Sequence, residues 1–171
     1  MNKNIYANEV TKMSAHDEYC LVFLKPGYAN NEHHEIPYIE GRIWALGLQI
    51  ADSGYALYNK ELARKHYSAH VEKSFYPSLE EYITSDVVYG IIVYGPFARV
   101  RMREIIGSTK NPANGTIRCE VLKYYPNLTQ EEKTTKNVVH CTDEETDPWV
   151  EISVFQDARA NYEKNNESNI D

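Results

Sequence analysis

The sequence predicts an α+β protein with a ferredoxin-like βαββαβ core, in which one antiparallel sheet is covered by a layer of helices. Apolar runs and segments of helical periodicity follow one another in the order strand, helix, strand, helices, strand, helix, loop, strand, helix. The chain also has 171 residues without an internal repeat, a length that suits one domain with a sizeable core. In such a fold we expect functional residues at the strand ends and in the loops after them.

The first half of the chain supplies two of the expected strands. The apolar run "YCLVFLKPG" (19–27) predicts a strand buried on both faces that ends in a turn at its proline and glycine. Residues 36–46 place isoleucines near helical spacing, and residues 47–59 alternate as a second strand does. Residues 60–73 and 77–85 then favour helices, the second opened by a proline in its first turn.

A third strand and a helix follow. "DVVYGIIVYG" (86–95) is the strongest strand signal in the chain. The helix expected over 96–108 stops at Gly107, and residues 109–118 are turn-forming throughout. This part of the chain therefore adds a strand and the helix that packs on it.

The last strand is expected at "NVVHCTD" (137–143), after a mixed and charged excursion over 119–136. Residues 146–155 predict a helix with an aspartate cap and a first-turn proline. The polar end, 161–171, has the composition of a disordered segment.

These elements divide the chain into three parts. Residues 1–18 are expected to form a flexible arm, residues 19–157 the folded domain, and residues 158–171 a polar tail.

The composition argues against two classes of partner. A formal net charge of −7 is unlike the basic surface of a general nucleic-acid binder. No run approaches the ~20 apolar residues that a membrane helix needs, and the first twenty residues lack the apolar core of a signal peptide. The three cysteines, Cys20, Cys119 and Cys141, are odd in number and form no CxxC pair. We therefore expect reduced thiols and a cytoplasmic protein.

Six short strings occur in order along the expected domain: "FLKPG", "KHY", "SFYPS", "VRMREIIGSTKNP", "NGTIR" and "NVVHCTD", followed by Glu151. Together they resemble the nucleoside diphosphate kinase family over roughly residues 19 to 157. The resemblance implies a ferredoxin-like core, a phosphohistidine intermediate and ping-pong exchange of the γ-phosphate between nucleotides, with Mg²⁺ carried on the nucleotide phosphates and no metal ligand from the protein.

The resemblance also implies a role for each matching residue. His140 is the nucleophile, Phe75 stacks on the base, and Glu151 supports the histidine directly or through the Thr142 hydroxyl. The phosphates and the sugar are held by Lys25, Tyr67, Arg103, Thr109, Arg118 and Asn137.

Elementary chemistry supports some of these roles independently. Phosphoryl transfer concentrates negative charge on the transferring oxygens, so a protein of net charge −7 must gather cations locally. Arg103 and Arg118 can each hold phosphate oxygens through paired N–H groups. Imidazole is a suitable nucleophile because it is largely neutral near pH 7.

Plain structural interpretations stand beside these roles. A single histidine at a strand end, an arginine on a helix or a phenylalanine such as Phe75 is often only structural. Lys25 is less ordinary, because an ammonium group at the end of a buried strand is costly unless it is paired. His33 and His34 lie between Glu32 and Glu35, which hints at a metal but fits a solvated loop better.

The chain departs from the family pattern at several points. Cys141 follows the histidine where the family has glycine, which adds bulk and sensitivity to oxidation. Thr142 replaces a serine and keeps the hydroxyl, while Gly27 replaces an aspartate. The loop 109–118 is shorter than in most members of the family, so the number of subunits in the oligomer is not fixed by the resemblance. The excursion 121–136 is longer than the family's usual connection.

Three functions are compatible with the sequence. The first is an active kinase whose partners are nucleoside di- and triphosphates, and which binds neither a membrane nor a specific nucleic acid. It would work as a homo-oligomer built on dimers, and these dimers could assemble further into a hexamer. The second is a catalytically weak nucleotide-binding regulatory protein, although such relatives usually lose the histidine or an arginine. The third is an RNA-binding ferredoxin-like domain, which would need basic and aromatic residues on strands such as 86–95, and that strand has no basic residue.

Overall fold

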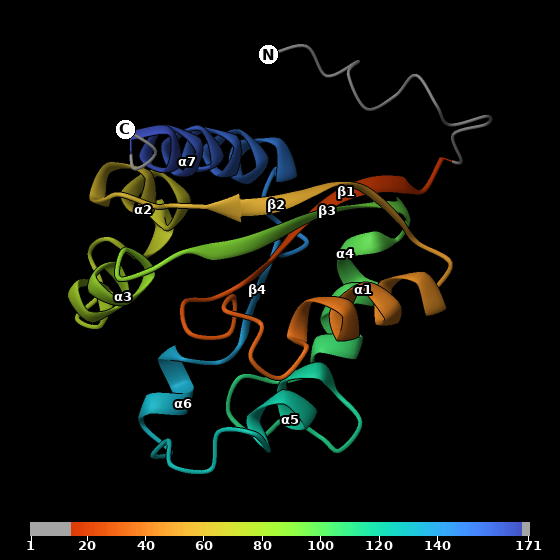
Figure 1. Cartoon of the computed structure of the whole chain (residues 1–171). Helices are drawn as coiled ribbons and strands as arrows, with labels where there is room; N and C mark the ends of the chain where they lie inside the picture. The colour runs from red at the N-terminus through yellow and green to blue at the C-terminus, as the bar shows by residue number, and fades with distance from the viewer. Residues whose placement is uncertain (1–14, 169–171) are drawn as a thin grey trace.

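The structure is a computed structural model that describes residues 15–168. Its centre is a four-stranded antiparallel sheet with the strand order β2-β3-β1-β4 (Figure 1). The strands are β1 (Asp17–Leu24), β2 (Gln49–Ala56), β3 (Val88–Pro96) and β4 (Val139–Cys141). Because β3 lies between β1 and β2, the sheet has the split βαβ arrangement. The predicted ferredoxin-like fold is confirmed.

Helices cover both faces of this sheet, where the sequence predicted one layer. The helices are α1 (Glu35–Ala45), α2 (Lys60–His66), α3 (Tyr76–Ile83), α4 (Ala98–Ile106), α5 (Ile117–Leu122), α6 (Glu132–Thr135) and α7 (Pro148–Ser168), with a 3₁₀ turn at Ser68–His70. One core packs α1, α4 and α5 against the sheet, and the other packs α2, α3 and α7. In Figure 1, α7 and α1 accordingly lie on opposite sides of the strands.

The central strand β1 supplies both cores. Cys20, Val22 and Leu24 belong to the core on the α1 side, whereas Leu21 and Phe23 belong to the core on the α7 side. This alternation follows from the two-residue period of a strand. All five side chains are fully buried, as the continuous apolar run predicted.

The final strand is shorter than the sequence predicted. It begins at Val139, because Val138 has a φ of +77° and lies in a γ-turn closed by the Val139 N–H donating to the Asn137 carbonyl at 3.0 Å. A positive φ is strained for a β-branched residue and is usually tolerated only where the surroundings hold it. Here Val138 is fully buried, and its carbonyl accepts from the Lys25 N–H at 2.9 Å.

The predicted disorder of residues 161–171 is wrong as far as Ser168. The aspartate cap is present, with Trp149 N–H donating to Asp147 Oδ1 at 3.0 Å, but the helix continues thirteen residues beyond the predicted end at 155. Its extension is anchored to the end of β2, because the Leu57 N–H donates to the Ala158 carbonyl at 2.9 Å and Ala158 is fully buried. The polar composition of this segment therefore gave no indication of a helix, because only a narrow face of the helix packs against the sheet.

The N-terminal arm lies largely outside the described residues. Strand β1 begins at Asp17, two residues inside the segment predicted as an arm. The division into arm, domain and tail stays a prediction. Over residues 15–168, no helix is both long and apolar enough to cross a bilayer.

Candidate active site

A cavity of about 580 Å³ opens beside β4, between the α2–α3 region and the C-terminal end of α4. It is lined by nine of the ten side chains that the sequence singled out: Lys25, Tyr67, Phe75, Arg103, Thr109, Arg118, Asn137, His140 and Glu151. The tenth, Thr142, is fully buried behind Glu151 and does not line the cavity. Residues more than a hundred positions apart are thus gathered by the sheet order and the turns that follow the strands.

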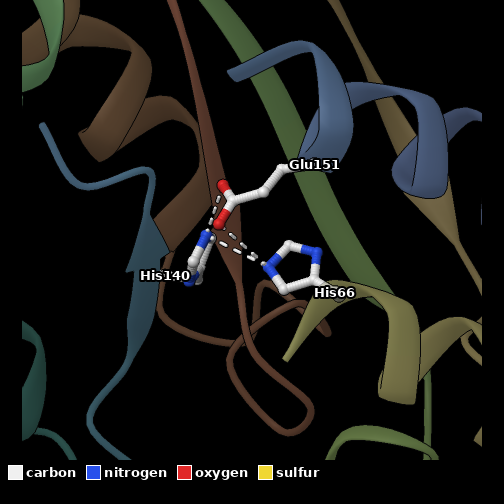
Figure 2. A group of neighbouring side chains, drawn as sticks. All are labelled: His66, His140 and Glu151. Carbon is white, nitrogen blue, oxygen red and sulfur yellow. Dashed lines mark hydrogen bonds and ion pairs between the residues drawn. The ribbon is translucent and has the colours of Figure 1, made fainter. Parts of the chain in front are cut away.

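His140 lies in β4 opposite Phe23 of β1, and the two rings stack with centroids 4.8 Å apart. Its Nε2 is 2.9 Å from Glu151 Oε2 (Figure 2). The Thr142 hydroxyl donates to the same oxygen at 2.6 Å. Glu151 comes from the first turn of α7, so a strand and a helix fix the ring together. The imidazole is held in one orientation, with Nε2 engaged and Nδ1 left as the second ring nitrogen.

His66 is a third member of this cluster, which the sequence reasoning missed. Its Nε2 is 3.2 Å from His140 Nε2 and 3.6 Å from Glu151 Oε1 (Figure 2). Its Nδ1 lies 3.2 Å from the Tyr58 hydroxyl, which can donate to it. A signal was present in the sequence, because His66 follows Leu62 and Ala63 at helical spacing on the buried face of α2.

The charges in this cluster are set by burial and by the neighbours. Burial raises the pKa of Glu151, but His140, His66 and the Thr142 hydroxyl outweigh this and lower it to about 2. Burial, and after it the neighbouring His140, lower the pKa of His66 to about 3, against the opposing effect of Glu151. At neutral pH a carboxylate therefore faces His140, while His66 is a neutral packing partner.

Two cationic side chains form the floor of the cavity. Burial lowers the pKa of Lys25 to about 7, with a further contribution from Arg118, and its Nζ donates to the Thr135 carbonyl at 3.2 Å. Burial also lowers the pKa of Arg118 to about 10, with Cys141 acting in the opposite direction and Arg103 adding to the decrease. An anionic ligand would stabilise the positive charges of these two buried side chains.

Arg118 is also a structural clamp. Its guanidinium donates to the carbonyls of Gly107, Asn137 and Val139, which ties the end of α4 to the start of β4. A guanidinium has five N–H groups, so two remain for a ligand after these three bonds. Arg118, which the resemblance assigned to phosphate binding, therefore also shapes the wall of the cavity.

Two polar atoms in the cavity wall have no partner within the described structure. The Tyr67 hydroxyl and the Asn137 Oδ1 atom are both buried and lack a hydrogen bond. Burial raises the pKa of Tyr67, so it stays a neutral phenol that can donate. Unpaired buried polar atoms are costly, and a ligand rich in hydroxyl and phosphate oxygens would satisfy both.

The remaining residues lie at the rim. The Phe75 ring is 52% exposed at the start of α3, and its centroid is 5.6 Å from that of His70. Arg103, at the end of α4, and Thr109, in the loop after it, are also exposed. The cavity thus has a charged interior and an aromatic edge.

Among the described residues, one group of three histidine and carboxylate side chains lies close enough together to hold a metal ion. His66, His140 and Glu151 bring three ligand atoms within 4.8 Å of one another. Two imidazoles suit Zn²⁺ better than Mg²⁺, which prefers oxygen ligands. His33 and His34 are exposed in the loop before α1.

Comparison with known proteins identifies the family of the chain. The profile of the family described as "Nucleoside diphosphate kinase" matches residues 18–160. The chain is 34% identical over 140 residues to a nucleoside diphosphate kinase of Rhodopirellula baltica, covering 81% of this chain and 85% of that protein. It is 35% identical over 141 residues to the enzyme of Mycobacterium leprae, covering 81% of this chain and 96% of that protein.

A solved structure is similar as well. The halophilic nucleoside diphosphate kinase from Halobacterium salinarum, in complex with CDP, superposes with a TM-score of 0.68 at 28% identity, over 82% of this chain and 88% of that one. Fold and site define an α+β phosphotransferase. The chain belongs to the nucleoside diphosphate kinase family.

Proposed function

We propose that the chain exchanges the γ-phosphate between nucleotides by a ping-pong mechanism, with His140 as the group that is phosphorylated. The observation that carries this proposal is the hydrogen-bonded series His140, Glu151 and Thr142, which faces a cavity lined by Lys25 and Arg118. A nucleophile needs a fixed orientation and a partner for the charge it develops, and this series supplies both.

The hydrogen bonding of His140 favours Nδ1 as the attacking atom. With Nε2–H donating to the Glu151 carboxylate, the free lone pair lies on Nδ1. Nδ1 attacks the γ-phosphorus of a nucleoside triphosphate, an N–P bond forms, and the bond to the β-phosphate oxygen breaks. The diphosphate leaves, the ring becomes cationic beside Glu151, and a terminal oxygen of a second diphosphate then attacks the same phosphorus to restore the free histidine.

The other predicted residues act through binding. Lys25, Arg103 and Arg118 offset the charge on the transferring oxygens, and Thr109 adds a hydroxyl. Tyr67 and Asn137 would satisfy their unpaired atoms on the sugar and phosphates. Phe75 offers its exposed ring to the base.

The cation in this reaction is Mg²⁺, held by the nucleotide phosphates and not by the protein. The residues present fit this arrangement, because the cavity presents cations where phosphates would lie, and the Glu151 carboxylate is already engaged. When bound, the ion neutralises phosphate charge.

The partners and setting follow from this function. The substrates are nucleoside di- and triphosphates, and the CDP in the Halobacterium salinarum enzyme supports this choice. We further propose a homo-oligomer built on a two-fold dimer, in the cytoplasm, where nucleotides are abundant and thiols stay reduced.

The proposal is tested by incubating the chain with γ-labelled ATP. We expect label on the protein that is labile to acid, stable to alkali and transferable to added diphosphate, as a phosphoramidate requires. His140→Ala should lose the label and the transfer while it still binds nucleotide. His33→Ala removes an exposed imidazole outside the cavity and should behave as the wild type.

Appreciable turnover by His140→Ala would contradict the assignment of the nucleophile. If the wild-type chain binds nucleotide but takes no label, the catalytically weak binding protein becomes the better description.

A further inference from the structure

Two of the three thiols of the chain lie in contact beside the nucleophile. Cys20 Sγ and Cys141 Sγ are 3.4 Å apart, although the residues are separated by 121 positions. The sheet explains the approach: Cys141 pairs with Val22 across β1 and β4, and Cys20 lies two residues before Val22 on the same face. The third thiol, Cys119, lies on α5, and its Sγ is 3.5 Å from Asn114 Oδ1.

The two thiols differ in their access to solvent. Cys141 is partly exposed and lines the cavity, whereas Cys20 is fully buried behind it. Arg118 lines the same cavity as Cys141. A hydrogen bond to Cys141 and burial both raise the pKa of Cys20. An oxidant that enters the cavity therefore meets Cys141 first.

We propose that Cys20 and Cys141 are a redox modification site, at which a hydroperoxide forms a reversible disulfide that inactivates the neighbouring His140. Nothing in the phosphoryl-transfer mechanism uses either thiol.

The chemistry balances in two steps. The Cys141 sulfur attacks hydrogen peroxide, the O–O bond breaks, and the products are a sulfenic acid and water. The Cys20 sulfur then attacks the Cys141 sulfur and displaces the hydroxyl, which leaves as water with the Cys20 proton. Two thiols are oxidised by two electrons and one peroxide is reduced, and an external thiol reverses the change by exchange.

The bond would disturb the site because Cys141 lies between two of its residues. A disulfide has sulfurs about 2.05 Å apart, so the two must come closer by roughly 1.4 Å. Strand β4 is only three residues long, so a displacement of Cys141 acts directly on both of its chain neighbours. Drawing Cys141 toward β1 shifts His140 on one side and, on the other, Thr142, whose hydroxyl holds Glu151.

The test uses the full chain, reduced and then treated with hydrogen peroxide. After alkylation and digestion, mass spectrometry should find the peptides of Cys20 and Cys141 linked, two hydrogens lighter than their sum, with Cys119 still alkylated. Phosphate transfer between ATP and a diphosphate should fall roughly a hundredfold, the scale of a displacement of about 1 Å at a catalytic group. Dithiothreitol should restore it.

Matched variants separate the pair from other oxidation. Cys119→Ser should keep both the cross-link and the reversible loss. Cys20→Ala should lose both, and Cys141→Ser serves the same purpose if the buried alanine variant fails to fold. Absence of the linked peptide in the wild type, or an equal reversible loss in the variants, would refute the proposal, as would a complete cross-link that leaves transfer unchanged. The cross-link is measured without reference to His140, so its failure is distinguishable from a failure of the proposed mechanism.

Discussion

Lys25 is the side chain whose ionisation is most open to change by a ligand. It is 6% exposed, and burial lowers its pKa to about 7. The unfolded chain would keep that proton up to a pKa near 10.4. Between these two values the unfolded state binds more protons than the folded state, so stability rises with pH across this window and is lowest below pH 7. A buried lysine with a lowered pKa is typical of a functional site, where its charge can bind a ligand.

The first prediction is that nucleotide binding takes up a proton. At pH 8 Lys25 is mostly neutral, and bound phosphates would raise its pKa and recharge it, with an uptake close to one proton. The uptake should be much smaller at pH 6, where Lys25 is already charged. Calorimetric titration with Mg-ADP in two buffers of different ionisation enthalpy measures this number.

Lys25→Met keeps the length of the side chain and removes the charge, and its titration should give no buffer dependence at pH 8. An equal uptake by this variant would assign the proton to another group.

A second prediction concerns Phe75. Its ring is 52% exposed and offers a face instead of hydrogen-bonding edges, so the base should be held by stacking. Stacking is sequence-tolerant and worth ~1–3 kcal/mol per base. Purine and pyrimidine diphosphates should all be substrates, purines somewhat better, and Phe75→Ala should weaken all of them by a similar factor.

Steady-state rates with four diphosphates check this. A rate ratio of roughly ten-thousandfold between bases would indicate hydrogen-bond recognition instead.

Nine of the ten residues named from the sequence line one cavity. The ten site residues, His140 among them, were named through the resemblance of six short strings to one family, and the cost of burying a charge singled out Lys25 alone. His66 was missed because a histidine on the apolar face of a helix is usually only packed there. The Cys20–Cys141 contact depends on the register between β1 and β4, which the residues alone do not reveal.

Between elements, α7 packs closely on the sheet at Gly90 of β3. A Cβ added to Gly90 of β3 would lie 2.2 Å from Phe155 Cε2, and Phe155 is fully buried. Glycine at this position lets α7 approach the strand, and α7 is the helix that carries Glu151 to the site.

The third prediction follows from this contact. Gly90→Ala should lower the free energy of unfolding by about 1–3 kcal/mol, because overpacking forces the ring or the helix to move. Gly41→Ala is the matched control: it lies exposed in α1 with no heavy atom within 4 Å of the added Cβ. This control should gain about 0.5–1 kcal/mol from helix propensity.

Urea unfolding at one protein concentration compares the two variants. If Gly90→Ala is as stable as the wild type, the interface between α7 and β3 is looser than the distances indicate.

Elements were predictable where one signal dominated. The continuous apolar run of β1 and the glycine stop of α4 at Gly107 were both identified from sequence. The length of α7 was not, because residues 158–168 are polar on most sides, and the bond between Leu57 and Ala158 that anchors them is a tertiary contact. The turn at Val138 was not identified from sequence either, because a valine gives no local signal for a positive φ.

At the scale of the molecule, strand order decides which surfaces are left to meet a partner. The order β2-β3-β1-β4 places the eight-residue strand β2 at an edge of the sheet. Just before it, at the end of α1, Trp44 is 61% exposed. Proteins seldom leave a long edge strand uncovered, and an exposed tryptophan nearby adds apolar surface that association would bury.

The last prediction is therefore that the chain forms a homo-oligomer built on a two-fold dimer, the commonest closed arrangement. Light scattering at micromolar concentration should give a mass of at least twice the 19.8 kDa of one chain. A mass equal to that of one chain would contradict the prediction and leave the edge of β2 without a partner. A mass six times larger would mean that dimers assemble further, and that the short loop 109–118 does not prevent a hexamer.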